Sequence, residues 1–193
     1  MASLSRKPIS IGFVILWGIL FSLPSILSAD TPQTTAADFK LKSVEGETYV
    51  LKELLAKGPV LVNFWTVWCK PCQKELPEMD KLYQKYKDQG YTFIAIAEDD
   101  QRTQSKVRPT VRQRKYTFPV LIDPDQSVGN LYAVRSYPTS YLISSAGTIV
   151  FTSSGFRKGD ELKIEKLIIE QLRLSKEATS GAASEADPKD GKS

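Results

Sequence analysis

Two cysteines stand two residues apart, at Cys69 and Cys72, within the stretch FWTVWCKPCQKELP, residues 64–77. Thiols at this spacing can bind a metal, attach a haem, form a structural disulfide or exchange electrons with another disulfide. Haem attachment requires a histidine directly after the second cysteine, and Gln73 stands there. A structural zinc normally takes four Cys or His ligands, whereas the 193 residues include two cysteines and no histidine. We therefore expect no metal site.

A structural disulfide is the remaining alternative to a redox role. A bridge between Cys69 and Cys72 would close a very short loop, so it would restrict the unfolded chain little and stabilise the fold weakly. The lack of histidine also excludes a Ser-His-Asp triad and a Cys-His nucleophile pair. We therefore predict a redox-active disulfide and no other cofactor.

The first 29 residues have the composition of a targeting segment. Arg6 and Lys7 precede the apolar stretch ISIGFVILWGILFSLPSIL, residues 9–27, which is long for a signal peptide and near the lower length of a membrane span. Residues 1–29 thus fit a cleaved signal peptide or a retained anchor, and the bulky Leu27 at the candidate cleavage site favours retention. In either case the following domain is exported, to the periplasm or the extracytoplasmic face of a membrane.

The rest of the chain divides into a linker at residues 30–35, one folded domain at residues 36–174 and a tail at residues 175–193. The tail contains no large apolar residue, so we expect it to be disordered. The net charge of +4 is modest. The basic stretch at residues 101–115 is interpreted as a solvated helix face, because a nucleic acid is not an expected partner of an exported chain.

Alternating strand and helix patterns predict an α/β fold with a central mixed sheet flanked by helices. The continuous apolar run at residues 58–67 suits a buried strand, and residues 71–88 carry apolar side chains at helical spacing. The acidic EDD stretch, residues 98–100, is interpreted as a solvated loop. Further elements are predicted as a hairpin at 38–51, a second buried strand at 91–97, a helix within 99–114, strands at 118–123, 140–145 and 148–154, a short helix near 128–132 and a closing helix at 158–174.

The cysteines would then lie where a buried strand turns into a helix, which favours a thiolate. The free N–H groups and the dipole of a first helical turn attract negative charge. Pro71 fits an early helical position because it has no N–H to leave unpaired, and Lys70 adds a nearby positive charge. We expect Cys69 to be the exposed, attacking thiol and Cys72 to lie one turn inward.

Three other side chains near the cysteines are candidates for the site. Glu75 follows Cys72 by three residues and shares its helix face, and helical side chains lean toward the N-terminus, so its carboxylate would point back at the sulfurs. Burial there would raise its pKa, although a solvent-facing residue of the first turn is the alternative. Trp65 and Trp68 would flank the pair with flat apolar surfaces, and Trp65 fits a core position equally well.

The stretch LVNFWTVWCKPCQKELP together with VRSYPTSYLI, residues 134–143, resembles the thioredoxin superfamily, and more closely its exported TlpA/ResA-like branch. The resemblance covers residues 36–174. It implies a thioredoxin-like fold with an N-terminal β-hairpin and a helical insertion. It also implies that a cis proline, Pro138, faces the cysteines, so that Tyr137, Pro138 and Trp68 bind the substrate.

One departure from thioredoxins concerns the buried acid. Asn63 stands where thioredoxins place a buried aspartate, and it cannot take a proton. The TlpA/ResA-like branch resembles this chain in having an acid after the motif, here Glu75. That acid is therefore the expected proton acceptor of the site.

The resemblance further implies an extracytoplasmic thiol-disulfide oxidoreductase that acts on protein disulfides. Members of this branch are reductants, kept reduced by a membrane thiol-electron donor, and their clients are apocytochrome c or copper-site cysteines. Cys69 would attack the client disulfide and Cys72 would resolve the mixed disulfide, with Glu75 managing its proton. The alternatives are a periplasmic oxidase or isomerase and, in another class, a Cu(I)-binding module. A peroxidase is not expected, because the P-x-x-x-T-x-x-C pattern is absent.

Overall fold

The computed structural model describes residues 34–185. The predicted signal peptide or anchor at residues 1–29, linker residues 30–33 and tail residues 186–193 lie outside the described part of the chain.

The described strands form one mixed sheet in the order β2-β1-β5-β4-β3-β6-β7. The central strand β3 is buried along its whole length, because it is apolar on both faces. It pairs in parallel with β4 and antiparallel with β6, which confirms the predicted mixed sheet. The strands are β1 Lys40–Ser43, β2 Thr48–Val50, β3 Val60–Trp65, β4 Thr92–Ala97, β5 Val120–Ile122, β6 Thr139–Ile143 and β7 Ile149–Ser154.

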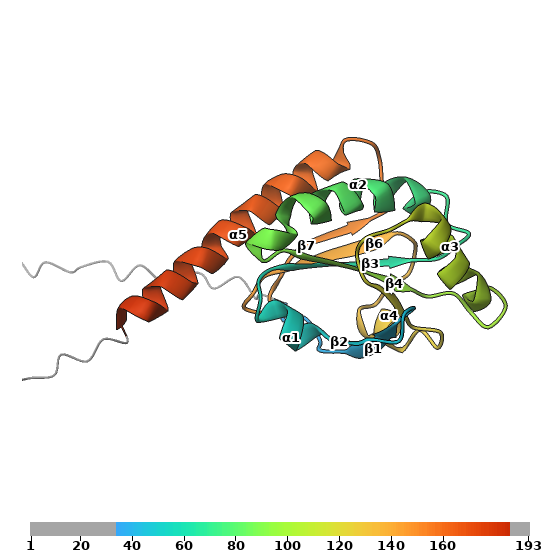
Figure 1. Cartoon of the computed structure of the whole chain (residues 1–193), viewed down its shortest axis with the longest axis horizontal. Coiled ribbons are helices and arrows are strands. Elements are labelled where there is room, and N and C mark those ends of the chain that lie inside the picture. Colours follow the sequence, from blue (N-terminus) through green and yellow to red (C-terminus); the bar gives the residue numbers. More distant parts are fainter. Residues whose placement is uncertain (1–33, 186–193) are drawn as a thin grey trace, which may run out of the picture. The chain divides into compact units, whose positions relative to one another are not determined.

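Helices cover both faces of this sheet. Figure 1 shows α2, α3 and α5 over one face and α1 and α4 over the other, and each face has its own apolar core. The long helix α2 packs over β3 and β4, so the residues that join β3 to α2 emerge at the edge where the parallel strands end. The helices are α1 Leu51–Leu55, α2 Cys72–Tyr86, α3 Val107–Arg114, α4 Ser127–Leu131 and α5 Asp160–Glu185, with 3-10 turns η1 Lys87–Gln89 and η2 Gln104–Lys106.

Both predicted additions to the thioredoxin-like fold are present. The hairpin β1–β2 pairs Lys40 with Val50, and the helical insertion between β4 and β5 is formed by η2 and α3. Helix α1 was not predicted, because five residues are too few to show a helical period, and its first residue, Leu51, was assigned to the end of the hairpin.

The prediction of a disordered tail from residue 175 is wrong as far as Glu185, because α5 continues to that residue. The segment 175–185, SKEATSGAASE, contains three alanines, two glutamates and one lysine, which are good helix formers. It also extends a helix whose earlier turns are packed through Ile168, so no new helix has to be nucleated. An ion pair between Arg173 and Glu177 spans the junction.

The chain enters the described fold beside the edge strand β7. Thr35 forms an isolated antiparallel bridge with Thr148, and the N–H of Ile149 donates to the carbonyl of Thr34 at 2.9 Å. These two threonines, which were assigned to a linker, therefore belong to the folded domain.

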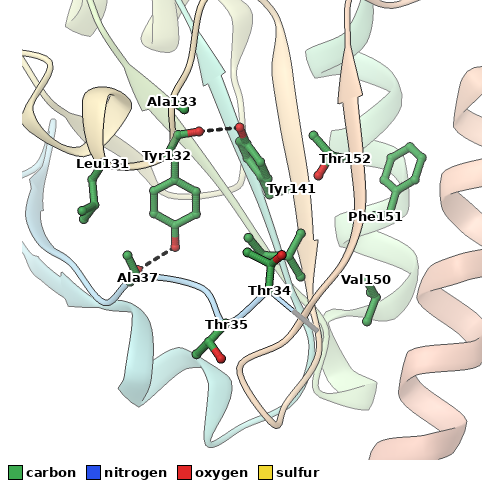
Figure 2. A pocket seen from close by; sticks show the side chains of 11 residues that line it. Thr34, Thr35, Ala37, Leu131, Tyr132, Ala133, Tyr141, Val150, Phe151 and Thr152 are labelled. Atoms are coloured by element: carbon green, nitrogen blue, oxygen red, sulfur yellow. Dashed lines mark hydrogen bonds between the residues drawn. The ribbon is translucent and has the colours of Figure 1, made fainter. Parts of the chain in front are cut away.

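A hollow of about 500 Å³ opens beside this point of entry (Figure 2). Its two phenols are engaged: the Tyr132 hydroxyl donates to the carbonyl of Ala37 at 2.7 Å, and the Tyr141 hydroxyl donates to the carbonyl of Tyr132 at 2.6 Å. None of the residues that line it comes from the cysteine motif or the Tyr137–Pro138 loop. The hollow is therefore not the candidate site.

Gly58 and Gly90 allow the starts of β3 and β4 to approach closely. Gly58 has a φ of +149°, and a Cβ there would lie 2.4 Å from the carbonyl oxygen of Gly90. Gly58→Ala should lower the free energy of unfolding by about 3 kcal/mol, since it adds a backbone clash to an unfavourable φ. Urea denaturation measures this loss.

Gly155→Ala is the matched control. Gly155 also has a positive φ, +79°, but nothing lies within 4 Å of the added Cβ, so the expected loss is only about 1 kcal/mol. Equal losses in the two variants would show that the close approach at Gly58 contributes nothing.

Candidate functional site

Cys69 and Cys72 lie at the junction of β3 and α2 and are joined by a disulfide, with Cα atoms 5.3 Å apart. Helical hydrogen bonds begin ahead of α2: the carbonyl of Cys69 accepts from the N–H of Gln73, and the carbonyl of Pro71 accepts from the N–H of Glu75. The N–H of Cys72 donates to the sulfur of Cys69 at 3.1 Å. After reduction, the same N–H would stabilise negative charge on that sulfur.

The accessibility of the motif differs from the prediction. Cys69 is 4% exposed in this oxidised form and Cys72 is fully buried. The prediction of an exposed Cys69 is wrong here, because its side chain packs into the core cluster that contains Trp65. Trp65 is itself a core residue, whereas Trp68 is 62% exposed and Lys70 is exposed. Of the two tryptophans, only Trp68 presents an exposed ring surface beside the cysteines.

The loop before β6 lies beside the end of β3. Thr139, the first residue of β6, pairs with Phe64 of β3, and the preceding Tyr137–Pro138 peptide bond is cis. The rings of Tyr137 and Trp68 lie 5.8 Å apart between centroids, at 79°, in an edge-to-face contact. The structure thus brings Tyr137 and Pro138 to the same edge as the cysteines.

The carboxylate of Glu75 is buried between α2 and the sheet, with only 1% of the residue exposed, which excludes the solvent-facing alternative. Its Oε2 accepts from Asn63 Nδ2 at 2.9 Å and its Oε1 accepts from Ser140 Oγ at 3.0 Å. Burial raises the pKa of Glu75 to about 7, although the hydrogen bonds from Ser140 and Asn63 oppose the shift. The group can therefore exchange a proton near neutral pH.

Ser140 was missed by sequence reasoning. It lies directly opposite Asn63 in the β3–β6 register, and Asn63 Nδ2 also donates to its hydroxyl at 2.8 Å. The available signal was the single polar residue Asn63 in the otherwise apolar run of β3, since a buried polar group needs a partner.

The acidic stretch after β4 was also misinterpreted. Glu98 and Asp99 are buried and only Asp100 is partly exposed, because these residues meet neighbouring elements at the edge where the parallel strands end. Glu98 Oε2 accepts from the Tyr137 hydroxyl at 2.8 Å, and Asp99 accepts from the N–H of Val67 at 3.0 Å. Burial raises the pKa of Glu98 to about 7.

The arrangement suits the transfer of two electrons between disulfides. Two sulfurs can switch between a disulfide and a dithiol, and a carboxyl group one turn along the helix can take or give the proton. Among residues 34–185, no three His, Cys, Asp or Glu side chains are grouped so that they could hold a metal ion.

Comparison with known proteins identifies similar sequences. The model of the AhpC/TSA family matches residues 32–152. The thiol-disulfide oxidoreductase ResA of Bacillus thuringiensis (strain Al Hakam) is 41% identical over 128 residues, which are 66% of this chain and 72% of that protein.

Solved structures are similar over most of the described fold. A putative thiol:disulfide interchange protein DsbE from Chlorobium tepidum superposes with a TM-score of 0.67 at 30% identity, covering 72% of this chain and 96% of that one. The exposed lipoprotein thioredoxin Etrx1 of Streptococcus pneumoniae strain TIGR4 gives a TM-score of 0.59 at 32% identity, covering 67% and 98%. These similarities confirm the thioredoxin-like fold.

Glu75→Gln should stabilise the oxidised protein at alkaline pH. The folded-state pKa of Glu75, about 7, lies above its ordinary 4.5, so between these values the folded protein binds more protons than the unfolded chain and stability falls as pH rises. Glutamine does not titrate. The gain should therefore be fully present above pH 7, at about 3 kcal/mol, and absent below about pH 4.5.

Urea denaturation at pH 4.5, 6 and 8 measures this difference. Glu78→Gln on the same helix is the control, because Glu78 pairs with Lys81 at the surface, and its effect should stay below about 1 kcal/mol. A difference between wild type and Glu75→Gln that does not change with pH would contradict a desolvated carboxyl group.

Proposed function

The chain belongs to the AhpC/TSA family and is a thiol-disulfide oxidoreductase, and we propose that it acts as a reductant of disulfides in exported client proteins. The proposal rests on one observation: a buried carboxyl group, Glu75, lies one helical turn beyond the Cys69–Cys72 disulfide. A carboxylate so placed disfavours a neighbouring thiolate, because like charges repel strongly where water is excluded. Destabilising the dithiol form makes the dithiol–disulfide couple more reducing, as expected of a reductant. Oxidants such as DsbA instead have a stabilised dithiol form.

The first step is attack on the client. The thiolate of Cys69 attacks one sulfur of the client disulfide, and the client S–S bond breaks as a mixed disulfide forms. The other client sulfur leaves as a thiolate and takes a proton from water. The N–H of Cys72, which points at the sulfur of Cys69, lowers the cost of the attacking thiolate.

The second step releases the client. Cys72 gives its proton to Glu75, and its sulfur attacks the sulfur of Cys69, so the mixed disulfide breaks and the second client sulfur leaves as a thiolate. That second client thiolate also takes a proton from water, so the client ends as a dithiol and the protein as the Cys69–Cys72 disulfide, with two electrons transferred. Glu75 then returns its proton to solvent, and no cofactor other than the disulfide takes part.

The client segment would lie between Trp68 and the Tyr137–Pro138 loop. Trp68 supplies an exposed aromatic face, and its edge-to-face contact with Tyr137 forms one side of the surface. Pro138 has no N–H, so the backbone groups of Tyr137 remain the candidates for hydrogen bonding to an extended segment. Lys70 and Pro71, exposed beside the cysteines, would border the same surface.

The proposed setting is extracytoplasmic. Residues 1–29 would export the domain and would be retained as an anchor or cleaved, and a membrane thiol-electron donor would restore the dithiol. The Streptococcus pneumoniae relative, described as an exposed lipoprotein, supports this setting, and the expected clients are apocytochrome c or copper-site cysteines. Within residues 34–185, no helix has both the length and the apolar character that crossing a membrane requires.

Cys69 should be alkylated before Cys72 in the reduced protein. Cys69 is the less buried of the two cysteines, and its sulfur accepts a hydrogen bond from the N–H of Cys72, which would stabilise a thiolate there. With limiting iodoacetamide, mass spectrometry of peptides should find label on Cys69, and the Cys69→Ala variant should react about tenfold more slowly than Cys72→Ala. Preferential labelling of Cys72 would reverse the assigned roles.

The reduction potential tests the direction of electron flow. It should lie near that of thioredoxin, about −270 mV, and well below that of DsbA, about −120 mV. Equilibration with thiol-disulfide buffers at pH 7, followed by alkylation and mass spectrometry, gives the value. A potential close to that of DsbA would make the protein a disulfide donor.

Cys72→Ala should in addition trap clients as mixed disulfides on Cys69.

A further inference from the structure

A second buried carboxyl group, Glu98, lies behind the aromatic pair of the site and has no part in the exchange steps. It follows β4, and its N–H donates to the carbonyl of Trp65 at 3.0 Å, which aligns it with the end of β3. Only 3% of the residue is exposed. Its Oε2 accepts from the Tyr137 hydroxyl at 2.8 Å, and its Oε1 has no hydrogen-bond partner among the described residues.

Helix α4 packs directly on this carboxylate. A Cβ at Gly129 would lie 1.8 Å from Glu98 Oε1, so only glycine leaves room for the carboxylate in its observed position. Gln126, next to α4, donates from Nε2 to the backbone carbonyl of Glu98 at 3.3 Å. Helix α4 thus confines the carboxylate most closely at Oε1, whereas Tyr137 binds Oε2.

The charged groups around Glu98 are few. From the end of β5, Asp123 is buried close by, with its carboxylate held by the N–H groups of Val128 and Gly129. Asp99, the next residue, is engaged with the N–H of Val67. None of the ion pairs found within residues 34–185 includes Glu98. The Tyr137 phenol is therefore the one side-chain donor that the structure gives this carboxylate.

Tyr137 is held at two points. Its hydroxyl is bound to Glu98, and its ring packs edge-to-face on Trp68, a side chain otherwise mostly in solvent. Because Tyr137 directly precedes Pro138, the orientation of its ring determines the shape of the surface next to the cysteines. A hydrogen bond to an ionised carboxylate is about twice as strong as one between neutral groups, so Glu98 is well suited to hold the ring.

We propose that Glu98 is a positioning residue for client binding: its carboxylate holds the Tyr137 ring against Trp68 and so shapes the surface that receives a client segment beside Cys69. The inference rests on the proposed function of that surface. It adds that the need for Glu98 differs between one kind of disulfide substrate and another. A disulfide within an extended peptide depends on Glu98. A small disulfide that reaches the sulfur without lying along the loop does not.

The ionisation of Glu98 makes the strength of its hydrogen bond with Tyr137 depend on pH. Burial raises the pKa of Glu98 to about 7, and the hydrogen bond from Tyr137 opposes the shift while neighbouring Asp123 adds to it. As pH falls through 7, Glu98 takes up a proton and the bond from Tyr137 becomes a weaker, neutral one. Tyr137 is therefore held most firmly above pH 7.

The test compares two substrates of the full chain at pH 8 in single turnover, with the protein reduced to the Cys69–Cys72 dithiol beforehand and freed of reductant, so that the dithiol supplies the two electrons. KM and kcat here denote the half-saturating substrate concentration and the limiting rate. One is a synthetic ten-residue peptide containing an internal disulfide, and the other is 5,5′-dithiobis(2-nitrobenzoate). Glu98→Gln should raise KM for the peptide about tenfold, as expected for the loss of one charge-assisted hydrogen bond, with kcat unchanged. Its rate with the small disulfide should match that of wild type.

The two substrates separate this inference from the proposed function. Wild type that reduces neither disulfide would refute the proposed function itself. Wild type that reduces both, with a Glu98→Gln variant that has an unaltered KM for the peptide, would refute only the positioning role. Equal losses on both substrates would also refute it, because they would indicate a general structural effect.

Gly129→Ala displaces the carboxylate without altering either partner of the hydrogen bond. Alanine is favourable in a helix, and the atom that its Cβ would meet is the end of a flexible side chain, so the fold should persist. KM for the peptide should rise as in Glu98→Gln, and Gly129→Ala should have no further effect in a Glu98→Ala background. Asn130→Ala, at an exposed position of α4, is the control and should leave KM unchanged. Additive effects of Glu98→Ala and Gly129→Ala would overturn the proposal.

The fluorescence of Trp68 reports on the Tyr137–Trp68 contact directly and does not change merely because a variant is less stable. The emission of Trp68, taken as the difference between wild type and Trp68→Phe, should change with a midpoint near pH 7. The change should disappear in Glu98→Gln and in Tyr137→Phe. It should persist in Glu75→Gln, which removes the other carboxyl group of similar pKa. A transition that survives in Glu98→Gln would contradict the proposed hold on Tyr137.

Discussion

A single buried amide, that of Asn63, ties together the three elements that form the site. Its Nδ2 belongs to β3 and donates both to Glu75 on α2 and to Ser140 on β6. Cys72 lies one turn before Glu75, and Pro138 lies two residues before Ser140, so the amide fixes the relative positions of the helix that carries the resolving sulfur and the loop that faces it. An amide cannot ionise, which leaves Glu75 as the one titrating member of this network. A donor lost from such a place leaves a desolvated acceptor without a partner, at a cost of about 1–3 kcal/mol.

The sheet separates two buried carboxyl groups that serve the same edge. Glu75 lies under α2, whereas Glu98 packs against α4 on the other face. Burial raises the pKa of each to about 7, and no lysine or arginine pairs with either in the part of the chain that the structure describes. Each acid instead accepts hydrogen bonds from neutral donors. In the roles proposed here, Glu75 moves a proton and Glu98 holds the Tyr137 ring. Proton transfer at Cys72 and the position of that ring should therefore both depend on pH near neutrality.

Local patterns predicted most of the fold. The apolar run through β3 and the helical spacing after Pro71 each report on one element, and together they place the cysteines at a strand-to-helix junction. The burial of Glu75 could also be anticipated, because a residue three positions after Cys72 shares its helix face. The tail was mispredicted because large apolar side chains indicate packing, whereas the end of α5 needs only helix propensity and a helix to extend.

The role of Glu98 could not be read from its neighbours in sequence. Three successive acids are ordinary in a solvated loop, and what buries Glu98 is distant along the chain: Tyr137 is 39 residues away, and Gly129 lies on another element. Likewise, the low exposure of Cys69 depends on how the disulfide packs against the core around Trp65. Such contacts arise from tertiary structure, which residue spacing does not encode.

The point at which the chain enters the described domain has a consequence for access to the sulfurs. Thr35 bridges to Thr148 just before β7 starts, while β6 begins at the cysteine edge and runs antiparallel to β7. Entry therefore lies at the opposite end of the sheet from the sulfurs, about 20 Å away for strands of this length. The edge that carries the sulfurs is therefore clear of the entering residues Thr34 and Thr35, so a client segment beside Cys69 does not compete with them for space.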